Sequence, residues 1–370
     1  MLTNTLVSLA VLVPAYLAWE VQGRRVDGPT YINYTTVTGY FLQDEATTDP
    51  TGFDYTQTNF GLLHRAYDTD AAFDPKGEKT QWARFANKVK HLNAKACPNT
   101  QYKVLLMQRH GEGWHNAAES FYGTPAWNCY WGLLDGNGTA IWNDPLLTAA
   151  GEAESIKAHN FWRTQISEQK QPAPESFYTS PLARCTTTVN TTFNGLGLDN
   201  FFPIVKEYLR EGISIRTCDH RSSKTYIANM FPWYRFEAGF AELDPLFNGV
   251  DYETSEAQAK RNKELLDELF TTDKNTWLSF TAHSGEIGSL LGVLKHRPFR
   301  LATGQAIPVL VKAVTFRKPE NFPPTSTIVS WTQPSTCTAL PVQSVDGKCV
   351  CPAATTGLAS SATATVTAVP

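Results

Sequence analysis

Short apolar runs alternate with amphipathic stretches through the middle of the chain, and this alternation constrains the fold more than any other feature. Runs with strand character lie at 102–107, 176–180, 204–209, 277–282 and 308–316. Five helical patterns lie between and after these runs. One begins near residue 116, one begins at a capping-box-like stretch at 148–152, and one passes through 189–193. The other two span 255–270 and 285–294. Strands that alternate with helices form a largely parallel sheet covered on both faces. The sequence therefore predicts an α/β protein, a three-layer α/β/α sandwich with a mostly parallel central sheet.

One long segment does not repeat this alternation. Residues 195–251 are rich in aromatic side chains and predict a helical and loop insertion over the carboxyl edge of the sheet. Open α/β sheets bind their ligands at that edge. Ionisable side chains follow four of the predicted strands: Arg109 and His110 the first, Arg184 the second, Glu211 the third and His283 the fourth. We expect these side chains to converge at one edge of the sheet.

These motifs, in this order, resemble those of the histidine phosphatase superfamily, in the branch that contains cofactor-dependent phosphoglycerate mutase. They are Arg-His-Gly-Glu at 109–112 with Asn116 six residues past the histidine, Ser-Pro-Leu-x-Arg at 180–184, a glutamate after the third strand and a late His-x-Gly at 283–285. Stretches at 53–55, 122–131 and 216–221 are similar to a fungal phosphoglycerate mutase-like subgroup. The resemblance spans residues 53–315.

The resemblance implies that His110 is the nucleophile and accepts the phosphoryl group as a phosphohistidine. It also implies that Arg109, Arg184, His283 and Asn116 bind the phosphate. Guanidinium groups suit that task because they form bidentate, charge-assisted hydrogen bonds, and they disfavour protonation of a neighbouring imidazole. The sequence holds no zinc spacing and no phosphate-binding loop that ends in Lys-Ser/Thr, and the proposed chemistry needs no metal or other cofactor.

The proton donor is the least determined residue of the predicted site. Glu211 is the candidate, as the acid that protonates the leaving oxygen and then activates water. Glu242 and Asp244 are the alternative acids, Glu112 could instead orient neighbouring groups, and Glu207 is expected to face solvent.

Other polar residues near the motifs leave more than one interpretation open. Trp114 and His115 are expected at the rim of the pocket, with His115 either a supporting donor or a bystander. Arg216, Arg221 and Lys224 are either ligands of a second anionic group on the substrate or solvated loop charges.

The two ends of the chain differ in composition from the rest. Residues 1–23 contain an apolar run too short to span a membrane, which favours a secretory signal peptide over a buried N-terminal helix. Residues 24–335 are expected to form the catalytic domain, and 336–370 a Ser/Thr/Ala-rich tail with cysteines and no fixed structure. No lipid or membrane anchor is expected.

Several features favour a secreted glycoprotein over a cytoplasmic protein. Asn-x-Ser/Thr acceptors stand at Asn33, Asn137 and Asn190. The chain has seven cysteines, so at least one thiol stays free or pairs between chains if the others are oxidised, and Cys185 and Cys218 are expected to be buried free thiols.

The formal net charge of −3 gives no sign of nucleic-acid binding. The sequence predicts a phosphomonoesterase that acts on a phosphorylated small molecule. The alternatives are a phosphoglycerate mutase-type transferase and, from another class, a catalytically silent secreted protein that binds surfaces.

Overall fold

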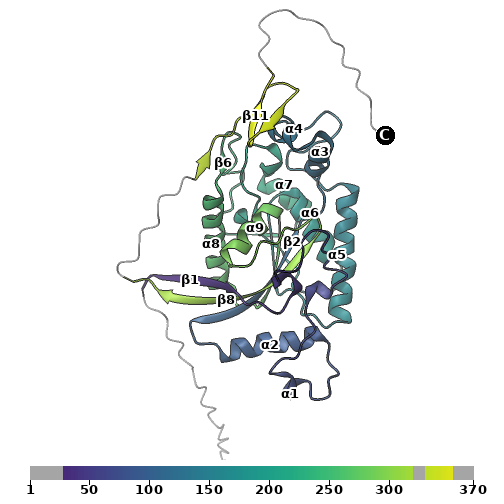
Figure 1. Cartoon of the computed structure of the whole chain (residues 1–370), viewed down its shortest axis with the longest axis vertical. Helices are drawn as coiled ribbons and strands as arrows, with labels where there is room; N and C mark the ends of the chain where they lie inside the picture. The colour runs from purple at the N-terminus through teal and green to yellow at the C-terminus, as the bar shows by residue number, and fades with distance from the viewer. Residues whose placement is uncertain (1–27, 320–329, 353–370) are drawn as a thin grey trace, which may run out of the picture.

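A computed structural model describes residues 28–319 and 330–352 of the chain. Its main sheet has seven strands in the order β1-β8-β2-β7-β3-β4-β5 (Figure 1). Five of them run parallel: β2 (Thr100–Arg109), β7 (Trp277–Ala282), β3 (Ser176–Thr179), β4 (Ile204–Val205) and β5 (Arg235–Phe236). Two run antiparallel to their neighbours: β8 (Ala306–Arg317) and β1 (Thr30–Thr36). The predicted mostly parallel sheet is confirmed.

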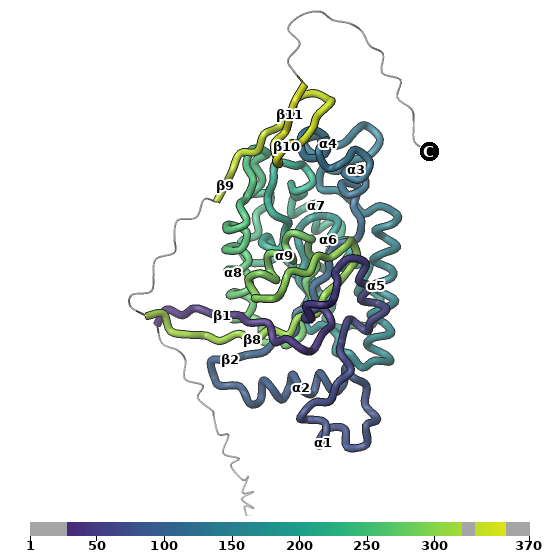
Figure 2. Tube along the Cα trace, in the orientation of Figure 1, coloured from purple at the N-terminus to yellow at the C-terminus, as the bar shows by residue number. Residues whose placement is uncertain are grey.

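Successive side chains of a strand point to opposite faces of the sheet, so a strand that is apolar throughout needs cover on both faces. Helices provide that cover here. Val104 and Leu106 of β2 belong to one core, to which α2 (Gln81–Lys95), α5 (Ala149–Ser167) and α6 (Ala183–Phe193) contribute most of the helical residues. Leu105 and Met107 belong to the other core, with α8 (Ser255–Thr272) and α9 (Ser284–Val293). Figure 2 shows α5 and α8 on opposite sides of the sheet, and the predicted three-layer sandwich is confirmed.

Three helices begin within a few residues of a strand's carboxyl end, and this places the predicted site. β2 leads into α3 (Trp114–Tyr122), β3 into α6, and β7 into α9. Polar residues in these connections therefore lie at one edge of the sheet and next to helix N-termini, whose free N–H groups favour anions. The short helix α4 (Thr124–Cys129) continues from α3.

The predicted insertion at 195–251 is more closely integrated than expected. It contributes β4 and β5 to the main sheet, together with α7 (Lys224–Met230). The expected strand at 204–209 ends at Val205, and Glu207–Leu209 form a 3-10 turn. Further small elements include α1 (Asp70–Phe73) and the two-stranded pair of β6 (Tyr252–Glu253) with β9 (Trp331–Thr332).

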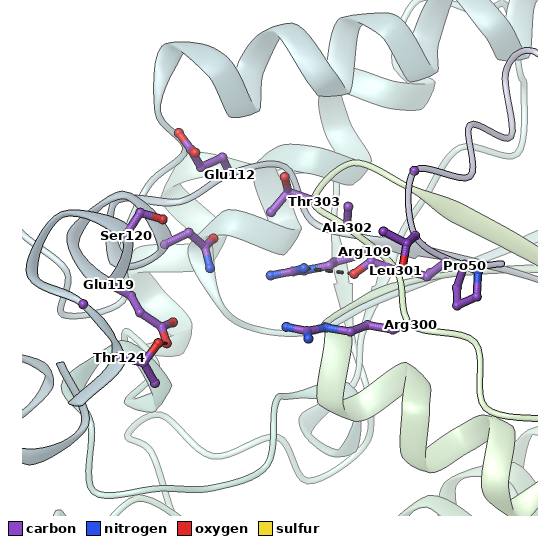
Figure 3. Close-up of a pocket in the computed structure, with 14 residues that line it drawn as sticks. Pro50, Arg109, Glu112, Glu119, Ser120, Thr124, Arg300, Leu301, Ala302 and Thr303 are labelled. Atoms are coloured by element: carbon purple, nitrogen blue, oxygen red, sulfur yellow. Dashed lines mark hydrogen bonds between the residues drawn. The ribbon is translucent and has the colours of Figure 1, made fainter. Parts of the chain in front are cut away.

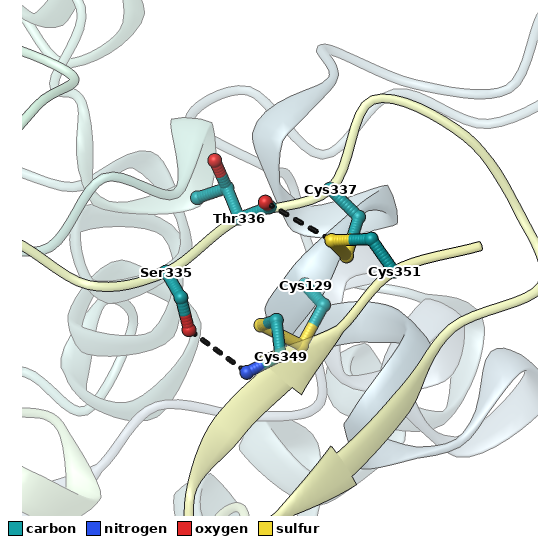
Figure 4. Close-up of a disulfide and its surroundings, with 6 residues drawn as sticks. All are labelled: Cys129, Ser335, Thr336, Cys337, Cys349 and Cys351. Atoms are coloured by element: carbon teal, nitrogen blue, oxygen red, sulfur yellow. Dashed lines mark hydrogen bonds between the residues drawn. A yellow bond between two sulfur atoms is a disulfide. The ribbon is translucent and has the colours of Figure 1, made fainter. Parts of the chain in front are cut away.

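The expectation of a tail without fixed structure from residue 336 is wrong for 336–352. This segment forms a hairpin of β10 (Gln343–Val345) and β11 (Lys348–Val350). One disulfide, Cys129–Cys349, joins the hairpin to the end of α4, and a second, Cys337–Cys351, closes its base (Figure 4). The free thiols are an exposed Cys97 and the two predicted buried cysteines.

Two predicted segments, the signal peptide at 1–23 and the tail at 353–370, lie outside the described residues. Within 28–319 and 330–352, no helix has the length and apolar character needed to cross a membrane.

Candidate active site

The ring of His110 lies at the carboxyl end of β2 and is 2% exposed. Its Nδ1 is 2.7 Å from the carbonyl oxygen of Gly111. A carbonyl only accepts, so Nδ1 carries the proton and the lone pair lies on Nε2. Burial, Arg184 and Arg109 hold the pKa of His110 well below its ordinary value. His110 is therefore a neutral imidazole with a nucleophilic Nε2.

The loop that carries His110 packs backbone to backbone on the start of α5. A Cβ at Gly111 would lie 2.3 Å from the carbonyl oxygen of Gly151, and a Cβ at Gly151 would lie 2.1 Å from that of Glu112. The Gly111 N–H also donates to the Thr188 hydroxyl at 3.0 Å. Both glycines are needed because neither contact leaves room for a side chain, and together they fix the loop beneath His110.

Two guanidinium groups flank the nucleophile. Arg184, at the start of α6, is 1% exposed and donates to the carbonyl of Cys218 at 2.7 Å, with Asp219 Oδ1 3.6 Å from its Nη2. Arg109 donates to the carbonyl of Leu301 at 2.9 Å. The Nε groups of both arginines are buried without a partner. An oxyanion placed between the two arginines would meet donors that the protein leaves unpaired.

His283 stands on the other side of the nucleophile, with its ring centroid 5.1 Å from that of His110. Its Nε2 is 2.8 Å from the Ser180 hydroxyl and 3.4 Å from the sulfur of Cys185. Burial and Arg184 lower its pKa well below the ordinary value, so His283 is also neutral. Asn116 accepts the Gly113 N–H through Oδ1 at 3.0 Å, which leaves its amide N–H groups for a ligand.

Glu211 reaches the same edge from the segment after β4. Its carboxylate accepts the N–H groups of Gly285, at 3.1 Å, and of Gly212, at 3.0 Å. A Cβ at Gly285 would lie 2.4 Å from Glu211 Oε1, so the glycine leaves the space in which the carboxylate lies. Burial and, after it, Asp219 raise the pKa of Glu211 despite these two hydrogen bonds. A raised pKa suits a carboxylic acid that must deliver a proton.

The alternative acids are engaged elsewhere. Glu112 accepts the Thr148 hydroxyl at 2.6 Å. Asp244 pairs with Arg210 at 2.7 Å, and Glu242 is exposed and caps Thr225.

The expectation that Glu207 faces solvent is wrong. Its side chain is buried and forms ion pairs with Arg210, at 3.0 Å, and Arg221, at 2.9 Å. Arg221 is not available as a substrate ligand, because all three of its guanidinium nitrogens donate within the protein, to Glu207 and to backbone carbonyls. Lys224 lies over the ring of Phe236. The two ion pairs of Glu207 compensate its buried charge, and they hold the segment that also carries Glu211.

A cavity of about 670 Å³, within the usual size range of small-molecule sites, opens at Arg109, the residue before the nucleophile (Figure 3). The residues that line it do not include His110, Arg184, Glu211 or His283. Arg109 and Asn116 of the predicted site line it, with Glu119 and Ser120 of α3 opposite. Figure 3 shows the guanidinium groups of Arg109 and Arg300 extending in the same direction toward α3. Arg300, which the sequence analysis missed, is thus the second cation at this cavity, where Arg216, Arg221 and Lys224 had been considered.

His115, expected at the rim of the pocket, lies beside the nucleophile. Its ring is 9% exposed and lies 5.4 Å from that of His110, centroid to centroid. Burial and Arg184 lower its pKa well below the ordinary value. The site thus contains three neutral histidines. No cluster of three or more His, Cys, Asp or Glu side chains within 28–319 and 330–352 is arranged to hold a metal ion.

The predicted glycosylation acceptors differ in their surroundings. Asn33 and Asn137 are exposed, on β1 and on a turn after α4. Asn190 lies in α6 with its Oδ1 buried, and the Thr192 hydroxyl of its acceptor motif is buried and accepts a hydrogen bond from Gln108. Asn190 is therefore less accessible to a glycan than Asn33 and Asn137 are.

Comparison with known proteins places two fungal relatives beside this chain. It is 46% identical over 287 residues to a protein of Arthroderma benhamiae described as a probable phosphoglycerate mutase, an alignment that covers 77% of this chain and 85% of the relative. It is 37% identical over 211 residues to phosphomutase-like protein 3 of Candida albicans, covering 56% and 65%. The solved ecdysone phosphate phosphatase of the silkworm shares 15% identity, with a TM-score of 0.37 over 70% of this chain and 96% of that one, too distant to bear on function. No family model matches the sequence.

Proposed function

Since the chain belongs to the phosphoglycerate mutase-like branch of the histidine phosphatase superfamily, whose members transfer phosphoryl groups, we propose that it hydrolyses phosphate monoesters through a phosphohistidine on His110. The observation that carries the proposal is the state of His110 itself. The Gly111 carbonyl accepts its Nδ1 proton, and two arginines disfavour a second proton. The lone pair of Nε2 is therefore ready to attack phosphorus.

The reaction has two steps. In the first, His110 Nε2 forms a bond to phosphorus, the ester P–O bond breaks, and Glu211 gives its proton to the leaving oxygen. Arg109 and Arg184 neutralise the charge on the transferring oxygens. In the second, the Glu211 carboxylate takes a proton from water, the water oxygen attacks phosphorus, and the P–N bond breaks to release phosphate and neutral His110.

A mutase shares the first step and differs in the acceptor. It must return the phosphoryl group to a hydroxyl of a sugar acid, whereas a phosphatase admits water. The cavity at Arg109 is lined by the exposed Ser120 and so admits water to this edge of the sheet, which favours hydrolysis. The convergence of the nucleophile, both arginines and the acid weighs against a silent surface-binding protein.

The test measures free phosphate and 2-phosphoglycerate separately, with a panel of phosphate esters and 3-phosphoglycerate as substrates. Wild type should release phosphate, and His110→Ala should release none, whereas the exposed His64→Ala should behave as wild type. Denaturation in alkaline detergent should trap a phosphoprotein in wild type only, and acid should then release its phosphate, because the P–N bond of a phosphohistidine is stable to alkali and labile to acid. Formation of 2-phosphoglycerate without free phosphate would favour the mutase, and full activity of His110→Ala would exclude the mechanism.

We also propose secretion and glycosylation. The two disulfides support this proposal because structural disulfides persist in oxidising compartments, and Asn33 and Asn137 are open to modification. Expression in a secreting eukaryotic host should place the protein in the medium. Asn33→Gln and Asn137→Gln should each remove one glycan, and Asn190→Gln none. A protein retained in the cytoplasm with reduced cysteines would contradict the proposal.

A further inference from the structure

The third histidine of the cluster has no role in the two steps above. His115 lies in the first turn of α3, and its ring sits beside that of His110. The nucleophile therefore has an imidazole at 5.4 Å in one direction and another at 5.1 Å in a second. The two neighbours differ in one respect, because Ser180 and Cys185 engage the ring of His283.

The ring of His115 makes no hydrogen bond to the part of the chain that the structure describes. Its Nδ1 is buried without a partner and faces Gly113, where a Cβ would lie 2.8 Å from it. A buried N–H without an acceptor is rarer than a buried acceptor without a donor. This places the proton of the neutral ring on Nε2, as one uncharged donor that the protein leaves free.

Other donors of the site are partly engaged by the protein. Arg184 already donates to the Cys218 carbonyl and Arg109 to that of Leu301. A transferring phosphoryl group spreads charge over three equatorial oxygens, each of which can accept more than one hydrogen bond. A free, neutral N–H beside the nucleophile can donate to one of these oxygens without adding a charge that would lower the basicity of His110.

We propose that His115 is a further catalytic residue, whose Nε2–H donates to an oxygen of the phosphoryl group as it transfers to His110. The inference rests on the proposed function, since it assigns a role within the same reaction. It also accounts for the small residue at position 113: Gly113 gives the His115 ring the space in which Nδ1 lies.

Two variants separate a donor from a packing role. His115→Phe keeps the ring volume and removes the donor, whereas His115→Gln keeps an N–H donor. Loss of one hydrogen bond to a charged group in the transition state corresponds to about 1.5–3 kcal/mol, which at 1.36 kcal/mol per tenfold is a fall of about 10- to 150-fold. We expect His115→Phe to lower kcat by this factor and to weaken inhibition by orthovanadate similarly, and His115→Gln to recover most of both.

The control is Phe121→Leu on the same helix, where the side chain is 67% exposed, and it should leave kcat and the vanadate inhibition constant unchanged. Thermal denaturation of each variant checks that the fold is intact, and His115→Leu replaces His115→Phe if the latter does not fold. Wild-type kcat and vanadate inhibition in the variant that lacks the donor would overturn the inference while the proposed function stands. So would equal loss in the folded Gln and Phe variants. Wild type that releases no phosphate from any ester would instead overturn the proposed function.

Discussion

A single methyl group at Gly285 should displace the proton donor. A Cβ at this position would lie 2.4 Å from Glu211 Oε1, whereas ordinary contacts begin near 3.4 Å, so the carboxylate must move by about 1 Å. The movement also weakens the hydrogen bond that the Gly285 N–H donates to it. A misplacement of about 1 Å at a reacting group lowers the rate by about 100-fold, which corresponds to about 2.7 kcal/mol of barrier.

The dependence on the leaving group identifies the cause. An alkyl ester leaves as a strongly basic alkoxide that needs the proton of Glu211, whereas p-nitrophenolate leaves without one. Gly285→Ala should therefore lower kcat by about 100-fold for glycerol phosphate and by less than about tenfold for p-nitrophenyl phosphate. Gly288→Ala in the same helix is the matched control, since a Cβ there meets no atom within 4 Å. Both substitutions favour the helix by up to about 1 kcal/mol, so neither should unfold the protein.

Steady-state kinetics with both esters, together with melting temperatures, decides the matter. Equal losses on the two esters would show that the methyl group perturbs phosphate binding and not proton transfer. An unchanged kcat for glycerol phosphate would show that the carboxylate of Glu211 is not held where the reaction needs it.

Three further predictions follow from the same site and its surroundings. Because the pKa of Glu211 is raised and that of His110 is lowered, kcat/KM should stay constant at acidic pH and fall as the pH rises through the pKa of Glu211. Glu211→Gln should lower kcat by about 10²- to 10⁴-fold and abolish this fall at alkaline pH. A fall in kcat/KM that survives in the variant would belong to another group. Cys129→Ser removes the disulfide between positions 220 residues apart and should lower the free energy of unfolding by about 2–5 kcal/mol in denaturant titrations without reductant. Cys97→Ser, at a free thiol, should leave the free energy of unfolding unchanged. Equal stability of the two variants would show that the disulfide does not stabilise the protein. Arg300→Gln should raise KM for esters with a second anionic group and leave KM for p-nitrophenyl phosphate unchanged, and a parallel rise for both would place Arg300 at the transferred phosphate instead.

The convergence of the site could be predicted from the sequence because it depends on local patterns. The apolar runs of β2, β3 and β7 are buried, and each ends where its motif begins, so the sheet brings His110, Arg184 and His283 to one edge. What could not be predicted depends on partners distant in the chain. β1 was missed because its pairing with β8 joins residues near 30 to residues near 317.

The errors have the same origin. Glu207 looks solvated in a segment without periodicity. Arg210 is only three residues away, but the pairing of Glu207 with Arg221, 14 residues further along the chain, depends on the fold. The fixed structure of 336–352 depends on the link between Cys129 and Cys349, and seven cysteines allow too many pairings for the sequence to select one. His115 carried a usable signal: it begins a helix that starts directly beyond the nucleophile, so its ring has a route back to the strand end.

The choice of arginine as the charged residue explains how this site can be buried. Removal from water disfavours the charged form of every group, and it is the largest cause of the low pKa values of all three histidines. Arg184 is 1% exposed, and the same burial would lower the pKa of a lysine in its place and favour loss of the lysine's proton. A guanidinium stays charged under that burial, because its pKa lies far above the working range. Burial therefore keeps the imidazole nucleophile neutral while the guanidinium groups beside it stay positive. A phosphate dianion that enters the site meets positive charge only on guanidinium groups, and these do not exchange protons with the substrate.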